Sequence, residues 1–297
     1  MAKATETKSN EVTVQKNSAV AVPDFMQQDM GQGFGNIDNS DLQTPRIILL
    51  QSVSPQVEEF ESARPGMFWH DTLNAPLGSV QDGFIFTPVF IDKRATLWRP
   101  RAPIDQGGIL ARSADLVHWV PSNTEFEAKI DKKGTKRVWN TRDSVAASRL
   151  LEWGTYDPED PNSQPAATLS YNLVAAAEDE EMGMMAGVVT FQRSSAAAAK
   201  KFLARAKLIR APLFGLRCKL SSQKVEGPSG AYYVPKVDVL GMLGADDLDF
   251  YHACKAMSDS FAENGLKMKD ADEDDAAMAP GRGNSSDADE ALDKKGV

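Results

Sequence analysis

Tryptophans and basic residues occur together in three short segments of this 297-residue chain. Trp98 is followed by Arg99 and Arg101, and Trp119 lies in the segment LVHWVP. Trp139 lies in KKGTKRVWNTR, whose basic residues are Lys132, Lys133, Lys136, Arg137 and Arg142. Proteins that bind single-stranded nucleic acids combine aromatic rings, on which bases stack, with cations that follow the phosphates. The pattern therefore indicates a single-strand interface, against the alternative that each tryptophan belongs to a core.

A second basic segment spans residues 193–224, which hold nine bases and no acid. Residues 194–210 have the spacing of an amphipathic helix, with Phe202, Ala206 and Ile209 on one face. The basic residues on its exposed side, or on the strand that follows, are Lys200, Lys201, Arg205, Lys207, Arg210, Arg217 and Lys219. Long basic side chains can reach phosphate oxygens, so this helix could hold a polynucleotide backbone. The alternative is a merely solvated helix.

Tyr232 and Tyr233 follow in GAYYVPK, which has the composition of a strand. Successive side chains of a strand point to opposite faces, so at most one of the two rings can face a ligand. We include Tyr232 among the candidate nucleic-acid-binding residues.

Sequence motifs of catalysis are missing: there is no P-loop, no GxGxxG after a strand, no GxSxG and no HExxH. The three histidines show no metal-ligand spacing with Cys218 or Cys254. The acidic run at 178–181 lies where a hairpin turn is expected, which favours a solvated loop over a cation site. We predict a binding protein and not an enzyme, with no cofactor and no metal.

The remaining composition fits a protein that stays in the cytoplasm, which for a viral protein is that of the host. No apolar run approaches the roughly 20 residues that span a bilayer, and the N-terminal residues lack the apolar core of a secretory signal. The chain has two cysteines, far apart in sequence, which argues against a disulfide scaffold. We expect no membrane contact.

Strand patterns outnumber helical ones in the middle of the chain. Strands are expected near residues 45, 84, 95, 117 and 136, and two hairpins are expected at 167–193 and 214–243. Helices are expected at 194–210 and at 245–265, the second with aspartates in its first turn and a glycine at its end. This pattern predicts a mainly β fold with two helices (α+β), and we expect an OB-like Greek-key barrel; a sandwich remains the alternative.

Changes in composition along the chain divide it into three regions. Residues 1–35 are polar and without periodicity, which predicts a disordered N-terminal arm, and residues 36–266 form the expected OB-like domain. Residues 267–297 form an expected disordered acidic tail; from residue 270 onward it holds nine acids and three bases. The tail could compete for the basic surface and recruit replication or recombination proteins, or it could only increase solubility.

Residues 33–264 resemble a family of bacteriophage single-stranded DNA-binding proteins. The resemblance rests on an N-x-x-x-x-D-L-x-x-P-R-I entry, an L-L-Q-x-x-S-P-x-V segment, a Pro-Gly turn and a tryptophan. These positions are Asn36, Asp41, Leu42, Pro45, Arg46, Ile47, Leu49, Leu50, Gln51, Ser54, Pro55, Val57, Pro65, Gly66 and Trp98. The resemblance implies an OB-type fold, single-stranded DNA binding and a role in phage replication or recombination. Residues 36–269 carry 27 bases and 29 acids, so we expect modest binding that depends steeply on salt.

Two other functions fit the same residues. A protein-recruitment factor would use the acidic tail without binding nucleic acid, and a virion assembly component would form stable homo-oligomers through a β-rich core. An enzyme with dispersed catalytic residues is a third possibility. The same surface features suit single-stranded RNA as well as DNA, and they are compatible with a homo-oligomer.

Overall fold

The computed structural model describes most of the chain between residues 44 and 266. The described ranges are 44–100, 104, 107–157, 159–179, 183–227 and 230–266. The predicted arm, residues 1–35, and the predicted tail, residues 267–297, lie outside the described residues.

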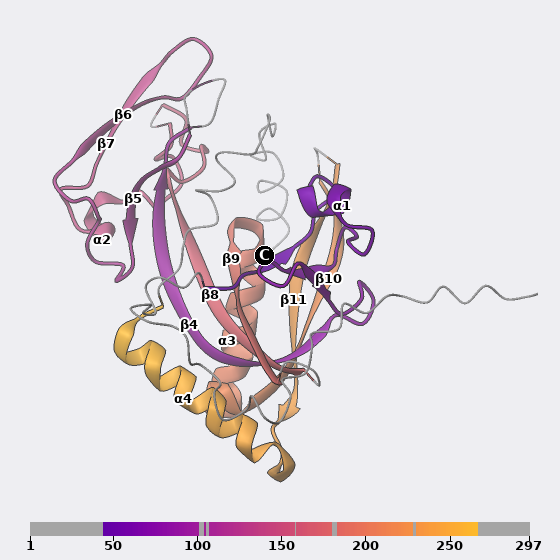
Figure 1. Cartoon of the computed structure of the whole chain (residues 1–297). Coiled ribbons are helices and arrows are strands. Elements are labelled where there is room, and N and C mark those ends of the chain that lie inside the picture. The colour runs from indigo at the N-terminus through magenta and orange to yellow at the C-terminus, as the bar shows by residue number, and fades with distance from the viewer. Residues whose placement is uncertain are drawn as a thin grey trace, which may run out of the picture.

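A curved antiparallel sheet forms the centre of the fold (Figure 1). Its strands follow the order β11-β10-β4-β8-β9, and β5 pairs with the far end of β4. The strands are β4 (Phe84–Trp98), β5 (Ile109–Ser113), β8 (Ala167–Asp179), β9 (Gly183–Gln192), β10 (Leu216–Gly227) and β11 (Gly230–Met242). The two predicted hairpins are confirmed as β8–β9 and β10–β11.

Strand β4 unites two segments that the sequence analysis treats as separate strands. The strand that pairs with β4 changes along its length. Phe84–Phe86 pair with β10, Thr87–Leu97 pair with β8, and Ala95–Trp98 pair with β5. Pro88, which has no N–H to donate, lies just past the β10 ladder. The register shifts between Pro88 and Phe90, and such a bulge increases local bending and twist.

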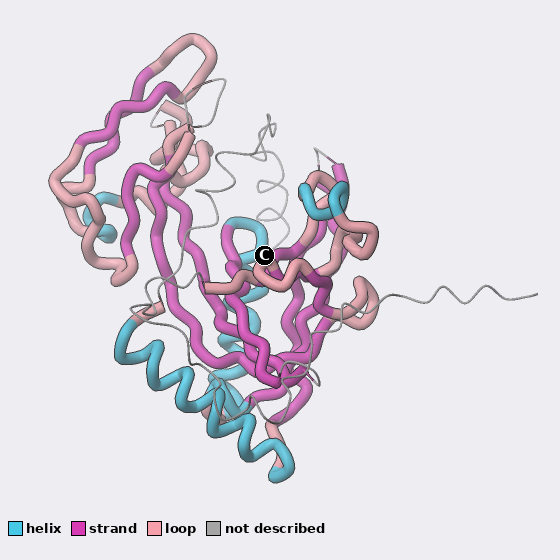
Figure 2. The backbone as a smooth tube through the Cα atoms, in the orientation of Figure 1, coloured by secondary structure: helices cyan, strands magenta, loops and turns pink. Residues whose placement is uncertain are grey.

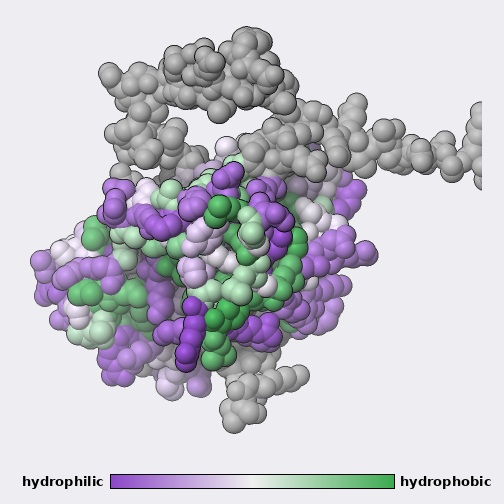
Figure 3. All heavy atoms as spheres, turned by 90° about the horizontal axis from the view of Figure 1, so that it is seen from below, coloured by the Kyte–Doolittle hydropathy of each residue, from purple (hydrophilic) through white to green (hydrophobic). Residues whose placement is uncertain are grey.

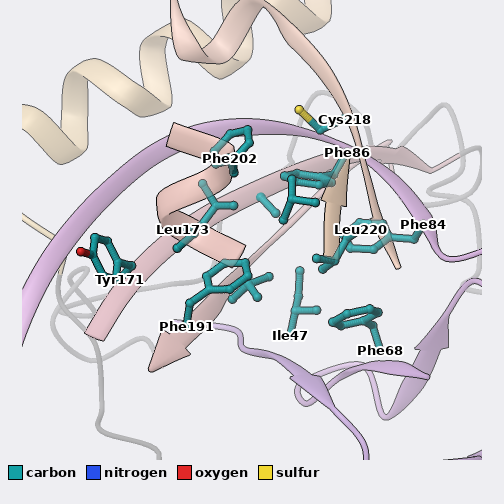
Figure 4. Packing of buried hydrophobic residues seen from close by; sticks show 14 of the residues in the cluster. Ile47, Phe68, Phe84, Phe86, Tyr171, Leu173, Phe191, Phe202, Cys218 and Leu220 are labelled. Carbon is teal, nitrogen blue, oxygen red and sulfur yellow. The ribbon is translucent and has the colours of Figure 1, made fainter. Parts of the chain in front are cut away.

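The inner face of the sheet is covered by a helix and a small sheet. These elements are α3 (Ala196–Ile209), β1 (Ile47–Leu49), β2 (Phe68–His70) and β3 (Ala75–Leu77). Figure 4 shows the cluster that they enclose, in which Phe202 of α3 packs with sheet residues such as Phe86, Leu173 and Phe191. Alternate residues of each strand point inward, as the two-residue period of a strand requires.

The outer face is covered by α4 (Leu248–Asn264), so helices lie on both sides of the sheet (Figure 2). Phe250 and Cys254 of α4 pack against Val89, Val174 and Val188. Both predicted helices are therefore confirmed. No helix in the ranges described above combines the length and the apolar composition that crossing a membrane requires.

The small sheet is tied to both edges of the large one. Arg46 and Val188 form a parallel bridge at the β9 edge. At the β11 edge the Gln51 side chain accepts from the Tyr233 backbone N–H (2.8 Å) and donates to the Tyr233 carbonyl oxygen (3.0 Å). Gly66 lies under the Tyr233 ring with a φ of +89°, and an added Cβ would be 2.5 Å from a ring carbon, so any other residue would strain the backbone and displace the ring.

The fold class is thus mainly β with helices, but the sheets are open. None of the sheets traced in the described residues closes on itself, so the expected OB-like barrel is not confirmed. The small sheet bridges the gap between β9 and β11 by isolated contacts and not by a continuous ladder.

Residues between β4 and β8 build a second hydrophobic cluster. They include β6 (Glu125–Lys129), β7 (Lys136–Asn140) and α2 (Val145–Ser148), while α1 (Pro55–Glu59) lies between β1 and β2. The β6–β7 hairpin lies at the margin of the molecule, away from α3 (Figure 1). The prediction of a strand near residue 117 is wrong. This segment is a loop, with one isolated bridge between Arg112 and Val120.

Candidate nucleic-acid interface

Two of the predicted stacking residues lie inside the second cluster. Trp119 is 1% exposed and donates its indole N–H to the Ser148 hydroxyl (3.2 Å). Trp139 is 4% exposed, donates to the Thr155 carbonyl oxygen (3.2 Å) and packs on Tyr156. A base cannot stack on a ring whose faces are already covered, so the structure corrects the assignment of both as stacking residues.

Two other tryptophans keep surface contact. Trp98, the last residue of β4, is half-buried, as is Arg99. Arg101 lies outside the described residues. Trp153 is 48% exposed, in the turn region after α2, and sequence reasoning missed it because no basic residue lies beside it in the chain.

Three predicted bases around Trp139 are held by carboxylates. Lys136 pairs with Glu127 across the β6–β7 hairpin (2.6 Å), and Arg142 pairs with Glu125 (2.6 Å). Arg137 pairs with Asp157 (2.6 Å), and this contact lowers the pKa of the Asp157 carboxyl. Acids that also lie between β4 and β8 therefore neutralise much of the positive charge predicted here.

The tip of the β6–β7 hairpin presents two cations that are not neutralised in this way. The Asp131 carboxylate accepts from the Thr135 backbone N–H (2.9 Å) and from its hydroxyl (2.6 Å), which orders the turn. These hydrogen bonds lower the pKa of Asp131. Lys132 and Lys133 between them are exposed and pair with no acid of the described ranges.

Helix α3 presents the largest group of such cations. Its buried residues are Ala199, Phe202 and Ala206, whereas Ile209, predicted on the same face, is 41% exposed. The exposed basic residues that form no ion pair within the described part of the chain are Lys200, Lys201, Lys207 and Arg210. No acid occurs within the helix.

The other predicted bases near α3 have partners or are partly buried. Arg205 lies 3.5 Å from Asp238 and Arg217 lies 3.9 Å from Asp247. The pKa of Asp238 is lowered, chiefly by its hydrogen bond to Lys236. Lys219 on β10 is half-buried.

Tyr232 and Tyr233 differ as the strand pattern predicts. Tyr233 is committed to the small sheet through Gly66 and Gln51. Tyr232 is half-buried on the opposite face and packs near Gly227. Stacking by Tyr232 therefore stays a prediction.

Within the described ranges, no group of three His, Cys, Asp or Glu side chains could hold a metal ion. His70 is buried, with its Nδ1 accepting from the Leu73 backbone N–H (3.2 Å) and its Nε2 3.3 Å from the Ala186 carbonyl oxygen, which gives it a structural role. Burial raises the pKa of the Cys218 thiol to about 12 and, with the charge of Glu178, that of Cys254 to about 11. Among the predicted bases, the exposed ones without an ion-pair partner in the described ranges form two sets, on α3 and at the hairpin tip, and such cations can bind anionic groups.

Comparison with known proteins gives one family. The model of the Pam3 phage gp34-like protein family matches residues 14–267, well over half of the chain. A search of the curated proteins and a search of the solved structures each give no match. The predicted bacteriophage origin is thus supported, whereas DNA binding stays a prediction. The chain belongs to the Pam3 phage gp34-like family of bacteriophage proteins.

Proposed function

We propose that this protein binds single-stranded DNA, without sequence specificity and without covalent chemistry, during phage DNA replication or recombination. The observation that best supports the proposal is the exposed face of α3, where Lys200, Lys201, Lys207 and Arg210 have no ion-pair partner among the described residues. Clustered cations without partners are what phosphate binding requires.

The spacing on α3 suits a linear polyanion. Seven residues make about two helical turns, so Ala197 and Ala204 lie on one line between a row with Lys200 and Lys207 and a row with Lys201. The small alanine side chains let a backbone approach closely while lysines on both sides reach its phosphates. Lys132 and Lys133 at the hairpin tip offer a second contact of the same kind.

Preference for single strands would come from stacking. With Trp119 and Trp139 buried, the candidates are Trp153, which is the more exposed, and Trp98. Stacking on one aromatic ring contributes roughly 1–3 kcal/mol per base and accepts every base. The proposal does not require a closed OB-like barrel, because electrostatic contact and stacking need only a surface.

The test is a fluorescence-anisotropy titration of labelled oligo-dT and of a duplex of equal length, at low and at moderate salt. Wild-type protein should prefer the single strand, and Lys200→Glu/Lys201→Glu should bind it more weakly at low salt. Lys255→Glu is the matched control, because Lys255 is an exposed lysine on the other long helix and already pairs with Asp259.

The outcomes separate the candidate functions. No binding of either DNA at low salt would end the proposal and favour a protein-recruitment factor. An equal loss of binding free energy per reversed charge in the α3 variant and in the Lys255→Glu control would show a general charge effect and no α3 interface. Trp153→Ala is expected to weaken oligo-dT binding more than duplex binding; equal losses for both would remove stacking by Trp153.

We also propose that the acidic C-terminal segment contacts replication or recombination proteins and competes with DNA. A version of the chain that ends at Lys269 should then bind oligo-dT more tightly than the full chain at low salt, where charge effects are strongest. Unchanged affinity would remove the competing role.

A further inference from the structure

The two halves of the edge strand β11 differ in how they are protected. In the first half, Gln51 occupies both backbone hydrogen-bonding groups of Tyr233, and Pro235 has no N–H to offer. Lys236 and Asp238 follow, as a charged pair 2.6 Å apart. Covered backbone, proline and charge are the usual means by which a sheet edge avoids pairing with another chain.

The second half of β11 carries none of these devices and is apolar. Val239 pairs with Cys218 and Gly241 with Arg217, which leaves Leu240 as the extra residue of a bulge. Bulges turn a side chain in a new direction. Leu240 is 54% exposed and Met242 is 64% exposed.

The last turn of α3 extends this apolar surface. Leu208 is 81% exposed, and it lines a shallow groove of about 420 Å³ together with Arg205, Ile209, Val239, Leu240 and Gly241. β11 ends at the lower end of the molecule in Figure 1, and Figure 3, which views that end, shows hydrophobic residues at the surface between hydrophilic ones. Soluble monomers rarely expose such contiguous apolar surface unless it is an interaction site.

We propose that this surface, formed by Leu208, Ile209, Leu240 and Met242, binds the same surface of a second copy of the chain. The distribution of charge around this surface supports a second copy of the chain as its partner. Exposed bases, Lys207 and Arg210, lie on the α3 side, and exposed acids, Asp246 and Asp249, follow β11 on the way into α4.

A two-fold interface requires a surface that is complementary to itself. An apolar centre with bases on one side and acids on the other meets that requirement, because the rotation brings the bases of each copy toward the acids of its partner. A polynucleotide fits this surface poorly, because its phosphates would be repelled by the acids and would find no partner in the apolar centre. An acidic peptide would be repelled by the same acids. The dimer does not require DNA, but it shares Lys207 and Arg210 with the proposed DNA-binding surface, so its test is made without DNA.

Sedimentation velocity of the full chain, across a wide concentration range and without DNA, tests the proposal. Wild-type protein should sediment with twice the chain mass, and Leu240→Lys should sediment as a monomer. Gly241→Trp should also be monomeric: a Cβ at Gly241 meets no atom within 4 Å, so the bulky side chain would block the partner and not the fold. Val138→Lys is the matched control, because Val138 is 58% exposed on the remote strand β7.

The charge arrangement has its own test. Lys207→Glu/Arg210→Glu should weaken the dimer, and adding Asp246→Lys/Asp249→Lys should restore it. Circular dichroism of every variant distinguishes loss of the dimer from loss of the fold. A wild-type monomer at all concentrations, a dimer that survives both Leu240→Lys and Gly241→Trp, or an assembly larger than a dimer would each overturn the proposal.

Discussion

Replacing Lys200 and Lys201 by alanine should change the salt dependence of DNA binding by an amount that follows from the ion-pair pattern. Helix α3, its C-terminal residue Arg210 and the β6–β7 tip present six exposed cations without an ion-pair partner in the described ranges: Lys132, Lys133, Lys200, Lys201, Lys207 and Arg210. Each phosphate contact to a single strand contributes about −0.7 to the slope of log K against log salt concentration, so these six predict a slope of about −4.2. Between about 50 and 200 mM salt, that slope weakens binding roughly 340-fold.

Lys200→Ala/Lys201→Ala removes two of the six contacts, so the slope should fall in magnitude to about −2.8, and the loss over the same salt range should be roughly 50-fold. Anisotropy titrations of labelled oligo-dT at five or more salt concentrations measure both slopes, with Lys255→Ala as the control that should keep the wild-type slope. An unchanged slope in the double variant would refute the assignment of α3 as a phosphate-binding surface. A wild-type slope much steeper than about −4.2 would show that further cations contact phosphates, either exposed ones such as Arg193 or ion-paired ones such as Arg137.

Three further predictions concern the fold. Phe202→Ala removes a fully buried ring from the inner cluster and should lower the free energy of unfolding by about 3–5 kcal/mol in urea denaturation; a loss below about 1 kcal/mol would show that the site collapses around the gap. Burial raises the pKa of Asp71, but hydrogen bonds from the Arg46 backbone and guanidinium outweigh it, and the net pKa lies below the usual 3.8. The stabilisation by Asp71 is thus present above that value and lost as pH falls through the folded-state pKa. Near neutral pH, wild type should unfold at a higher urea concentration than Asp71→Asn, and the two urea midpoints should become equal in strong acid. A difference between the midpoints that does not change with pH would contradict this assignment. Cys218 and Cys254, with thiol pKa values raised to about 12 and about 11, should resist Ellman's reagent in the native protein and react in denaturant; rapid native labelling would contradict their burial.

Local sequence patterns were sufficient for the elements that repeat a simple period. α3 could be predicted because Phe202 and Ala206 recur at helical spacing, and the β8–β9 and β10–β11 hairpins because strand-forming runs flank polar turns. Ile209 was misplaced because the last turn of α3 borders an open groove, where helical spacing no longer implies burial.

The candidate site was harder to predict, because the burial of its tryptophans and the ion pairing of its bases depend on contacts between distant residues. Strand alternation shows that Val138 and Trp139 face opposite sides of β7, but the pattern itself does not tell which side is covered. The structure exposes Val138 and buries Trp139. Similarly, Arg137 and Arg205 are neutralised by acids 20 and 33 residues away, which no local spacing reveals.

The two hydrogen bonds between the Gln51 side chain and the Tyr233 backbone also determine the order in which parts of the fold can form during synthesis. The two residues are 182 positions apart in the chain, so the ribosome needs roughly 10–35 s to deliver the second after the first, at about 5–20 residues per second. During that interval β1 lacks its anchor on β11, whereas the second cluster, built from residues 95–167, has already been made in full. The nascent chain should therefore acquire protease resistance in residues 95–167 first, and its N-terminal strands should gain protection only when β11 has left the exit tunnel.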